Sequence, residues 1–137
     1  MKALAVIIGP TAVGKTDICI RLAQHFSTPV VNADSRQIYK ELNIGTASPT
    51  AEEQSKAKFL FVGSLSISDY YNAAMYEQDA LEAINGILST RDIAILSGGS
   101  MMYVDAITKG IDDIPTIDET TRNFMHERLE NEGLDSL

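Results

Sequence analysis

A chain of 137 residues with 45% hydrophobic and 22% charged residues has the composition of one ordinary globular domain, which excludes a collagenous or wholly disordered chain. The sequence contains no apolar run of the ~18 residues that a membrane span needs, and we expect a cytoplasmic protein that does not associate with membranes. Eleven Lys and Arg residues against 19 Asp and Glu residues give a net charge of -8, which argues against a protein whose whole surface binds nucleic acid.

The N-terminal quarter of the sequence predicts two short strands joined by a helix. Residues Ala3–Ile8 are all apolar and are followed by a Gly-Pro pair, which predicts a strand buried on both faces of a parallel sheet. From Thr16 the spacing predicts an amphipathic helix that ends before Pro29, and residues 30–33 predict the second strand. The helix is indicated by apolar residues four positions apart, namely Ile18, Leu22 and Phe26, with Cys19 and Ala23 beside them. This order is that of a βαβ unit.

The remaining sequence predicts a continued alternation of strands and helices. Thr50 and Glu53 have the spacing of a capping box, which predicts the start of a short helix. Ser68 and Asp69 are polar residues suited to cap the longest helix. The elements expected after the second strand are, in chain order, a loop over 43–50, a strand over 59–62, a helix from 70 to 88, a strand over 93–96, a turn over 97–100, a helix over Met101–Lys109 and a charged helix over 116–132.

A phosphate-binding loop follows the first predicted strand and matches the pattern G-x-x-x-x-G-K-[ST]. It lies where that pattern must lie, between a strand and a helix N-terminus, so that backbone N–H groups can point at phosphate oxygens. Lys15 would supply a point charge, and the hydroxyl of Thr16 is placed for Mg²⁺. The sequence therefore predicts a site for a di- or triphosphate formed by Gly9, Pro10, Thr11, Ala12, Val13, Gly14, Lys15 and Thr16.

The loop by itself leaves open which group is transferred, because ATPases, GTPases and kinases share it. A Walker B strand normally ends in Asp, whereas the strand over 93–96 is followed by Ser97 and two glycines, which disfavours the usual hydrolytic arrangement. Asp34 is the acidic residue at a strand end, where ligands bind in open α/β sheets. An Asp before Ser35 could instead cap the turn that follows.

Further motifs appear in order along the chain: D-S-R-Q-I-Y at 34–39, I-G-T-A at 44–47 with Pro49 and Thr50, and G-G-S-M-M-Y at 98–103. Together with the phosphate loop they closely resemble the tRNA dimethylallyltransferase family, and the matches continue through Ile114-Pro115 to residues 118–122. These enzymes attach a dimethylallyl group from its diphosphate to N6 of the adenosine beside the anticodon. The resemblance implies a P-loop NTPase-like α/β fold, a parallel sheet flanked by helices, with a catalytic core over 1–115 and the start of a helical tRNA-binding insertion over 116–137.

The resemblance also implies roles for single residues. The loop over 9–16 would bind the diphosphate of dimethylallyl diphosphate, with Lys15 and Thr16 catalytic and Thr16 bearing on Mg²⁺. Asp34 would be the general base. The residues that would contact the tRNA anticodon stem-loop are Asp34, Ser35, Arg36, Gln37, Ser100 and Arg122.

The sequence departs from the family pattern at a few positions. Ser100 replaces the commoner Thr and keeps its hydroxyl, Met101-Met102 replaces Gly-Leu, and residues 56–59 replace a histidine-bearing segment. Family members are typically about twice as long, so the chain resembles their N-terminal half. Because its net charge is -8, we expect these residues, as a monomer, to bind diphosphate but to modify tRNA poorly.

Two other functions share the phosphate loop. A small-molecule kinase is disfavoured because the arginines do not gather into a lid, and a non-enzymatic nucleotide-binding module is the second alternative. His25 and His126 lack ligand partners at zinc-site spacing, Cys19 is expected to be packed, and the acidic residues over 112–118 are expected to be solvated. Tyr70, Tyr71 and Tyr76 are expected to pack in the core from the longest helix, with their hydroxyls at the rim.

Overall fold

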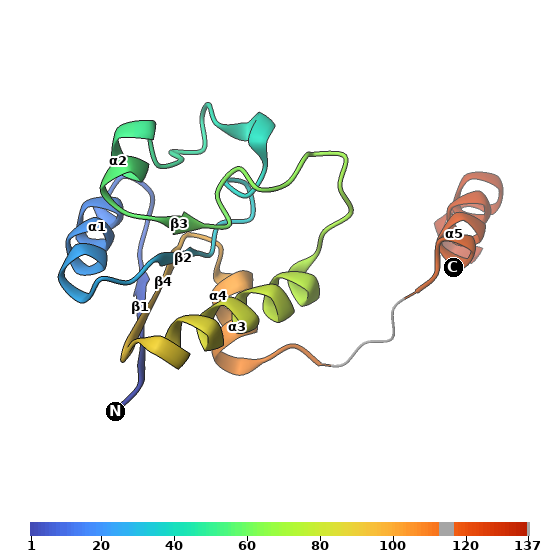
Figure 1. Cartoon of the computed structure of the whole chain (residues 1–137). Helices are drawn as coiled ribbons and strands as arrows, with labels where there is room; N and C mark the ends of the chain where they lie inside the picture. Colours follow the sequence, from blue (N-terminus) through green and yellow to red (C-terminus); the bar gives the residue numbers. More distant parts are fainter. Residues whose placement is uncertain (113–116, 137) are drawn as a thin grey trace.

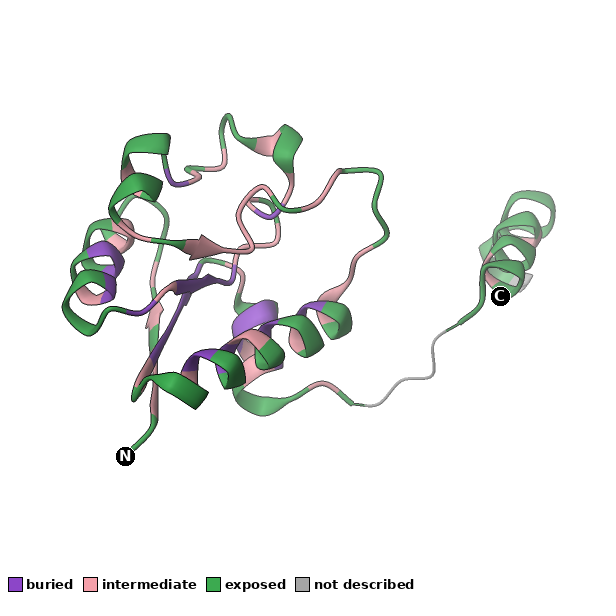
Figure 2. Cartoon of the chain, in the orientation of Figure 1, coloured by how far each residue is buried: buried purple, intermediate pink, exposed green. Residues whose placement is uncertain are grey.

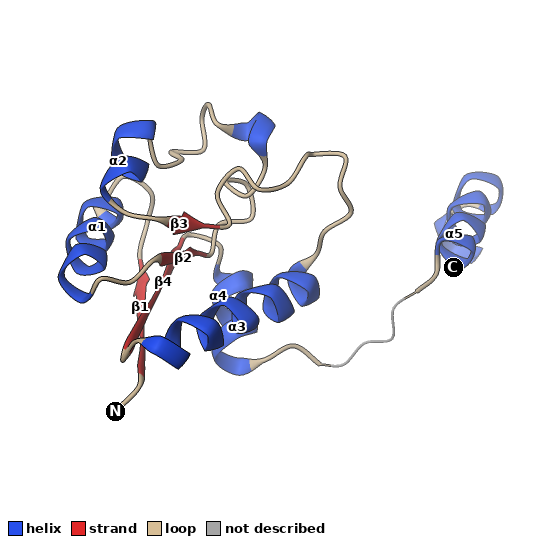
Figure 3. Ribbon diagram, in the orientation of Figure 1, coloured by secondary structure: helices blue, strands red, loops and turns tan. Residues whose placement is uncertain are grey.

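A parallel four-stranded sheet with the strand order β1-β4-β2-β3 lies at the centre of the fold, and helices cover both of its faces (Figure 1, Figure 3). The computed structural model describes residues 1–112 and 117–136. Its elements are β1 (Ala3–Ile8), α1 (Lys15–Phe26), β2 (Val30–Asn32), a 3₁₀ turn (Lys40–Leu42), α2 (Ala51–Lys56), β3 (Phe59–Leu60), α3 (Ala73–Thr90), β4 (Ile93–Gly98), α4 (Met101–Lys109), α5 (Glu119–Glu132) and a 3₁₀ turn (Leu134–Ser136). The predicted α/β fold class is confirmed.

The central strands β2 and β4 are apolar on both faces because each face carries a helical layer. Val30 of β2 pairs in register with Ile95 of β4, and both pack under α1. The next pair, Val31 and Leu96, points to the opposite face and packs against α3 and α4. All four side chains are fully or almost fully buried, as the purple strands of Figure 2 show, so alternation along two strands divides the core between two helical layers.

The prediction that β1 is buried on both faces is wrong. β1 is an edge strand of the described sheet and pairs on one side with β4. As a result Val6 is 38% exposed and Ile8 is 52% exposed. The apolar run predicted the strand correctly, but its place in the strand order depends on pairings with residues about 90 positions away.

The buried face of α1 also differs from the predicted one. Cys19, Ile20 and Ala23 are buried, whereas Ile18 and Phe26 are exposed. The rotation of α1 follows from its contacts with Val30 and Ile95, which the spacing of apolar residues within the helix does not specify. The expectation that Cys19 is packed is confirmed.

The longest helix, α3, begins later than predicted. Its cap is Asn72, whose side chain accepts a hydrogen bond from the backbone N–H of Met75 at 3.0 Å. Ser68 and Asp69 lie in the preceding loop, where Asp69 Oδ2 accepts from the backbone N–H of Ser66 at 2.7 Å. The prediction that Ser68 and Asp69 cap this helix is therefore wrong, because a closer polar residue satisfies the free N–H groups of its first turn.

The late start of α3 separates the three tyrosines. Tyr76 is fully buried, stacks on Tyr103 with ring centroids 4.0 Å apart, and donates its hydroxyl to the Asn32 carbonyl at 2.9 Å. Tyr70 and Tyr71 precede the helix, and Tyr70 is 58% exposed. Core packing is thus confirmed for Tyr76, whose hydroxyl is buried and not at the rim, and for the half-buried Tyr71, whose hydroxyl donates to Asp79 Oδ2 at 2.8 Å at the exposed rim. It is wrong for Tyr70.

Other predicted elements differ only at their ends. The capping box is confirmed, since Thr50 Oγ1 accepts from Glu53 N and Glu53 Oε2 accepts from Thr50 N. β3 is shorter than expected, and β4 continues through Gly98. Asp118 caps α5, but the expected start at Thr116, the 115/116 domain boundary and the Ile114-Pro115 match lie outside the described residues. None of the helices over 1–112 and 117–136 is long and apolar enough to cross a bilayer.

Gly98 allows an unusually close approach between two backbones at the end of the sheet. A Cβ at this position would lie 2.0 Å from the Ala33 carbonyl oxygen. We predict that Gly98→Ala lowers the free energy of unfolding by about 2 kcal/mol or more, because the backbones must separate to admit a methyl group.

The matched control is Gly86→Ala within α3, where a Cβ meets no atom within 4 Å. That change should raise stability by about 0.5–1 kcal/mol, since Ala favours a helix over Gly. Urea unfolding of both variants measures the difference, and equal midpoints would contradict the assignment of a tight contact at Gly98.

Candidate active site

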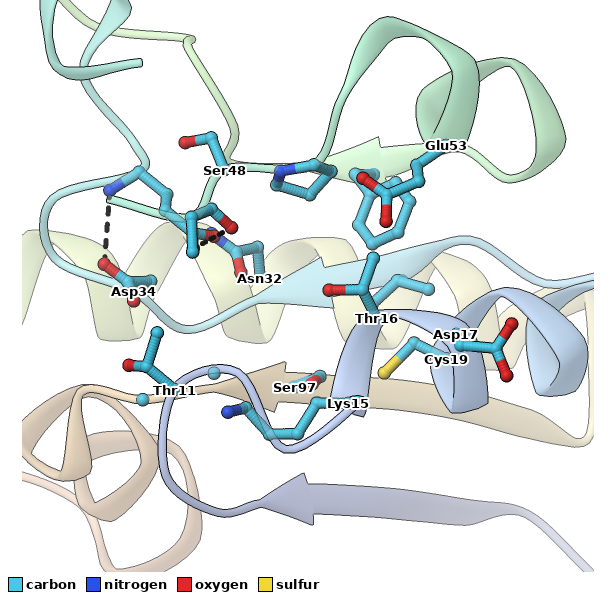
Figure 4. A pocket seen from close by; sticks show the side chains of 18 of the residues that line it. Thr11, Lys15, Thr16, Asp17, Cys19, Asn32, Asp34, Ser48, Glu53 and Ser97 are labelled. Atoms are coloured by element: carbon cyan, nitrogen blue, oxygen red, sulfur yellow. Dashed lines mark hydrogen bonds between the residues drawn. The ribbon is translucent and has the colours of Figure 1, made fainter. Parts of the chain in front are cut away.

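A cavity of about 440 Å³ opens at the carboxyl ends of the parallel strands, where open α/β sheets bind ligands (Figure 4). The phosphate loop and the start of α1 form one side of it. The ends of β2 and β4 contribute Asn32 and Ser97, and residues 47–49 with Glu53 and Phe59 form the opposite side. Five of the eight predicted diphosphate-binding residues line the cavity: Thr11, Ala12, Gly14, Lys15 and Thr16.

The phosphate loop has the backbone geometry that its pattern predicts. Gly14 adopts φ +93° at the N-cap of α1, a left-handed conformation that favours glycine, and Ala12 adopts φ +65°. Lys15 reaches across the loop, and its Nζ donates to the carbonyls of Gly9 at 2.7 Å and Pro10 at 2.6 Å. These bonds hold the ammonium of Lys15 against the loop. Lys15 is the only Lys or Arg among the described residues that line the cavity. Anions are stabilised at such a site by N–H dipoles of the helix N-terminus.

Asp34 both caps a turn and faces the cavity, so the two interpretations of this residue are compatible. It follows β2, and its Oδ1 accepts from the backbone N–H groups of Arg36 at 3.0 Å and Gln37 at 3.2 Å, the latter drawn in Figure 4. Within residues 1–112 and 117–136, no hydrogen bond is made to its Oδ2. One carboxylate oxygen is therefore held in place while the other is available to a ligand.

Ser35 and Ser100 lie next to Asp34 and support its position. The backbone N–H of Ser35 donates to Ser100 Oγ at 2.8 Å, and that hydroxyl donates to Ser35 Oγ at 3.0 Å. The backbone N–H of Ser100 also donates to the Ala33 carbonyl at 3.1 Å. Neither serine is among the described residues that line the cavity. Their hydroxyls join the end of β2 to the start of α4.

Gln37 links Asp34's turn to the opposite side of the cavity. Its Nε2 donates to the carbonyls of Thr46 at 2.9 Å and Ala47 at 3.1 Å, and Gln37 itself lines the cavity. Arg36 is exposed and does not belong to the described lining. The structure therefore brings Lys15, Thr16, Asp34 and Gln37 together around one space.

Arg122 lies outside this cavity, on α5. Its Nη2 donates to the hydroxyl of Tyr70 at 2.8 Å, and its guanidinium lies over the Tyr70 ring, 4.6 Å from the centroid. This hydrogen bond lowers the pKa of Tyr70. The contact ties α5 to the loop before α3 and gives the exposed Tyr70 a specific partner.

Several polar residues line the cavity without having been predicted as site residues from the sequence, notably Asn32 and Ser97. Both are buried at the ends of otherwise apolar strands, and Asn32 Nδ2 donates to the Phe61 carbonyl at 3.2 Å. Each follows an apolar run in the sequence, and a polar residue at the end of a predicted strand could have indicated a site residue. Cys19 also lines the cavity, and burial raises the pKa of its thiol, which keeps it protonated near neutral pH.

The charge of the cavity bears on a metal ion. Against Lys15, the lining contains the carboxylates of Asp17, Asp34 and Glu53, so a bound diphosphate would meet an excess of negative charge. Mg²⁺ prefers hard oxygen ligands. It is usually bound by phosphate oxygens of a substrate together with only one or two protein groups. The hydroxyl of Thr16, in the first turn of α1, fits such an ion, and the described residues contain no cluster of three His, Cys, Asp or Glu that would hold a metal by itself.

Comparison with known proteins identifies close relatives of the whole chain. It is 53% identical over 137 residues to tRNA dimethylallyltransferase 1 of Bacteroides thetaiotaomicron, a match that covers all of this chain and 44% of that protein. The full-length tRNA isopentenylpyrophosphate transferase of Bacillus halodurans has a similar structure, with a TM-score of 0.77 and 29% identity over 99% of this chain and 45% of that one.

A second similar structure comes from a eukaryote. It is a dimethylallyltransferase acting on tRNA, with a TM-score of 0.75 and 25% identity over 96% of this chain and 36% of that one. The chain thus spans less than half the length of the relatives it matches. The sequence model of the IPP transferase family matches residues 37–137. This match and the shared fold show that the chain belongs to the IPP transferase family.

Proposed function

We propose that this chain forms the diphosphate-binding and base-bearing part of an enzyme that transfers a dimethylallyl group from dimethylallyl diphosphate to N6 of the adenosine beside the anticodon of tRNA. The observation that carries the proposal is that Lys15, at the start of α1, and Asp34, which follows β2, line one cavity. A cation beside a phosphate loop and a carboxylate with one free oxygen are the two groups that this reaction needs. The activity would take place in the cytoplasm and belong to a protein as long as the relatives, of which this chain covers about 45%.

The leaving group is the first requirement of the reaction. When the carbon–oxygen bond of the allylic diphosphate breaks, negative charge accumulates on the diphosphate and positive charge spreads over the allyl group. The N–H groups of the phosphate loop and the ammonium of Lys15, which now donates to the carbonyls of Gly9 and Pro10, would stabilise that negative charge. Mg²⁺ bound by Thr16 and phosphate oxygens would supply further positive charge to the same oxygens.

The nucleophile is the second requirement. The exocyclic amine of adenine is weakly nucleophilic because its lone pair is delocalised into the ring. A carboxylate that accepts an amine proton as the carbon–nitrogen bond forms accelerates such a step by roughly 10²–10⁴-fold. Asp34 suits this role because its Oδ1 is fixed by two backbone N–H groups and its Oδ2 has no bond to a described residue. The proton goes to Asp34, and diphosphate is released.

The tRNA contacts form the third part of the proposal. An adenosine within a folded anticodon loop must leave its stack to reach a pocket, and polar side chains then read its edge. Gln37 lines the cavity and is available for this contact, while Ser35 and Ser100 would act by holding the turn that carries Asp34. Arg36 is exposed and Arg122 is half-buried; both lie outside the cavity and would contact the tRNA backbone.

Lys15→Ala should weaken the binding of dimethylallyl diphosphate by more than about tenfold, since it removes the cation of the cavity and leaves the backbone donors. Calorimetry in the presence of Mg²⁺ measures the change. Lys40→Ala is the control, because Lys40 is an exposed lysine outside the cavity. Unchanged affinity in a folded Lys15→Ala variant would refute the diphosphate site.

In a full-length relative that carries these motifs, substitution of Asn at the position of Asp34 should lower kcat by about 100-fold or more while tRNA affinity changes little. An amide still forms hydrogen bonds but cannot accept the proton. Single-turnover kinetics and a tRNA binding isotherm separate the two effects. A loss confined to tRNA affinity would make this residue a binding group and not the base.

Ser100→Ala should lower the free energy of unfolding by about 1–2 kcal/mol, because the part-buried N–H of Ser35 loses its acceptor. Ser100→Thr keeps the hydroxyl and should remain within about 0.5 kcal/mol of the parent protein. Urea denaturation distinguishes the two variants. If both behave alike, the hydroxyl does not support the turn that carries Asp34.

A further inference from the structure

A second pocket, of about 370 Å³, lies at the opposite end of the sheet from the phosphate loop. It is formed where the chain enters three parallel strands: Thr28 and Pro29 precede β2, Lys58 precedes β3, and Arg91 precedes β4. Because the strands are parallel, these entries share the amino-terminal edge of the sheet, whereas the candidate active site lies at the carboxyl edge. The two pockets share no lining residue.

The second pocket is basic in an acidic protein. Its lining contains Lys56, Lys58 and Arg91 and no carboxylate, although the whole chain has a net charge of -8. Lys56 forms an ion pair with Glu52, but the described structure gives the ammonium of Lys58 no hydrogen bond or ion pair. Arg91 donates from Nε to the Ser27 carbonyl and from Nη1 to Thr90 Oγ1, which orients its guanidinium and leaves Nη2 without a described partner.

Thr28, one of the lining residues, has a buried hydroxyl that forms no hydrogen bond with a described residue. The residue is 5% exposed. Buried hydroxyl groups are nearly always bonded, so an unsatisfied one beside a cavity indicates capacity for a ligand. Two nearby carbonyls are already hydrogen-bonded: Ala23 O accepts from Thr28 N, and Lys56 O accepts from Gln24 Nε2. These two carbonyl oxygens therefore do not form a cation site in the pocket.

We propose that this second pocket binds a phosphate group. Lys58 and Arg91, which have free donors, line this pocket from separate loops together with Lys56 and Thr28, whose hydroxyl is unsatisfied. Phosphate oxygens are acceptors that suit all of these groups. The phosphate would belong either to a free small phosphate compound or to a nucleic-acid backbone, since both present the same oxygens. The site includes residues of the 56–59 segment, which the candidate active site uses only through Phe59.

Amide NMR of the full 137-residue chain, titrated with inorganic phosphate at constant ionic strength, tests the proposal residue by residue. The amides of Thr28, Lys58 and Arg91 should shift with a saturable dependence, separately from those of the phosphate loop. Lys58→Gln should weaken this site by about fivefold or more and leave the loop unaffected, whereas Lys15→Ala should do the reverse. Lys58→Gln is suitable because its side chain has no described partner to lose.

Lys40→Gln is the matched control, because Lys40 is an exposed lysine that lines neither pocket. Thr28→Val, which keeps the side-chain shape, should also weaken phosphate binding at the second pocket. The proposal is overturned if these amides show no saturable shift, or if Lys40→Gln reduces the shifts as much as Lys58→Gln does.

A short RNA hairpin distinguishes the two sources of phosphate. The bound group is a backbone phosphate of RNA if two results are obtained. The hairpin must shift the same amide resonances at a lower concentration than inorganic phosphate does, and Lys58→Gln must weaken the binding of the hairpin. If inorganic phosphate moves these amides and the hairpin does not, the ligand is a free phosphate compound. Both results support a phosphate site and differ only in the molecule that carries the group.

Discussion

The candidate site depends on the close approach of Gly98 in β4 to Ala33 at the end of β2. A side chain at position 98 would meet the Ala33 carbonyl at 2.0 Å, so glycine alone permits the two backbones to meet. Ala33 N donates to Ser97 O at 2.7 Å, and Ala33 O accepts from Ser100 N at 3.1 Å. These bonds join the end of β2 to the beginning of α4, and Asp34 follows directly. The carboxylate is thereby held at the edge of the sheet where the phosphate loop begins.

Buried polar side chains extend this arrangement to the far side of the cavity. Tyr76 of α3 donates to the Asn32 carbonyl, while the Asn32 side chain donates to the carbonyl of Phe61. Phe61 has φ +61°, a costly conformation for a bulky residue, and its ring packs edge-on against Tyr76. Gln37 provides a second link through its bonds to Thr46 and Ala47. Both sides of the cavity are therefore held by hydrogen bonds to backbone, which suits a site that must keep its charges in place.

The two ends of the parallel sheet carry different electrostatics. The cavity at the carboxyl edge is lined by one lysine and three carboxylates, so its described lining has an excess of negative charge. The second pocket, at the amino edge, is lined by three basic residues and no carboxylate among the described residues. Because the strands run in parallel, the loops that leave the sheet meet at one edge and the loops that enter it meet at the other, so the two pockets are lined by different loop residues.

The sequence by itself determined the features that depend on neighbouring residues. The phosphate loop, the βαβ order, the capping box at Thr50 and the acidic residue after β2 all follow from local spacing and turn chemistry. Only the tertiary structure decided the edge position of β1, the buried face of α1 and the support that Ser100 gives to Ser35. Each of these depends on which distant segments pair or pack, and Ser35 and Ser100 are 65 positions apart. Local patterns carry no information about such long-range contacts, because a strand or helix of the same sequence can occupy several places in a sheet.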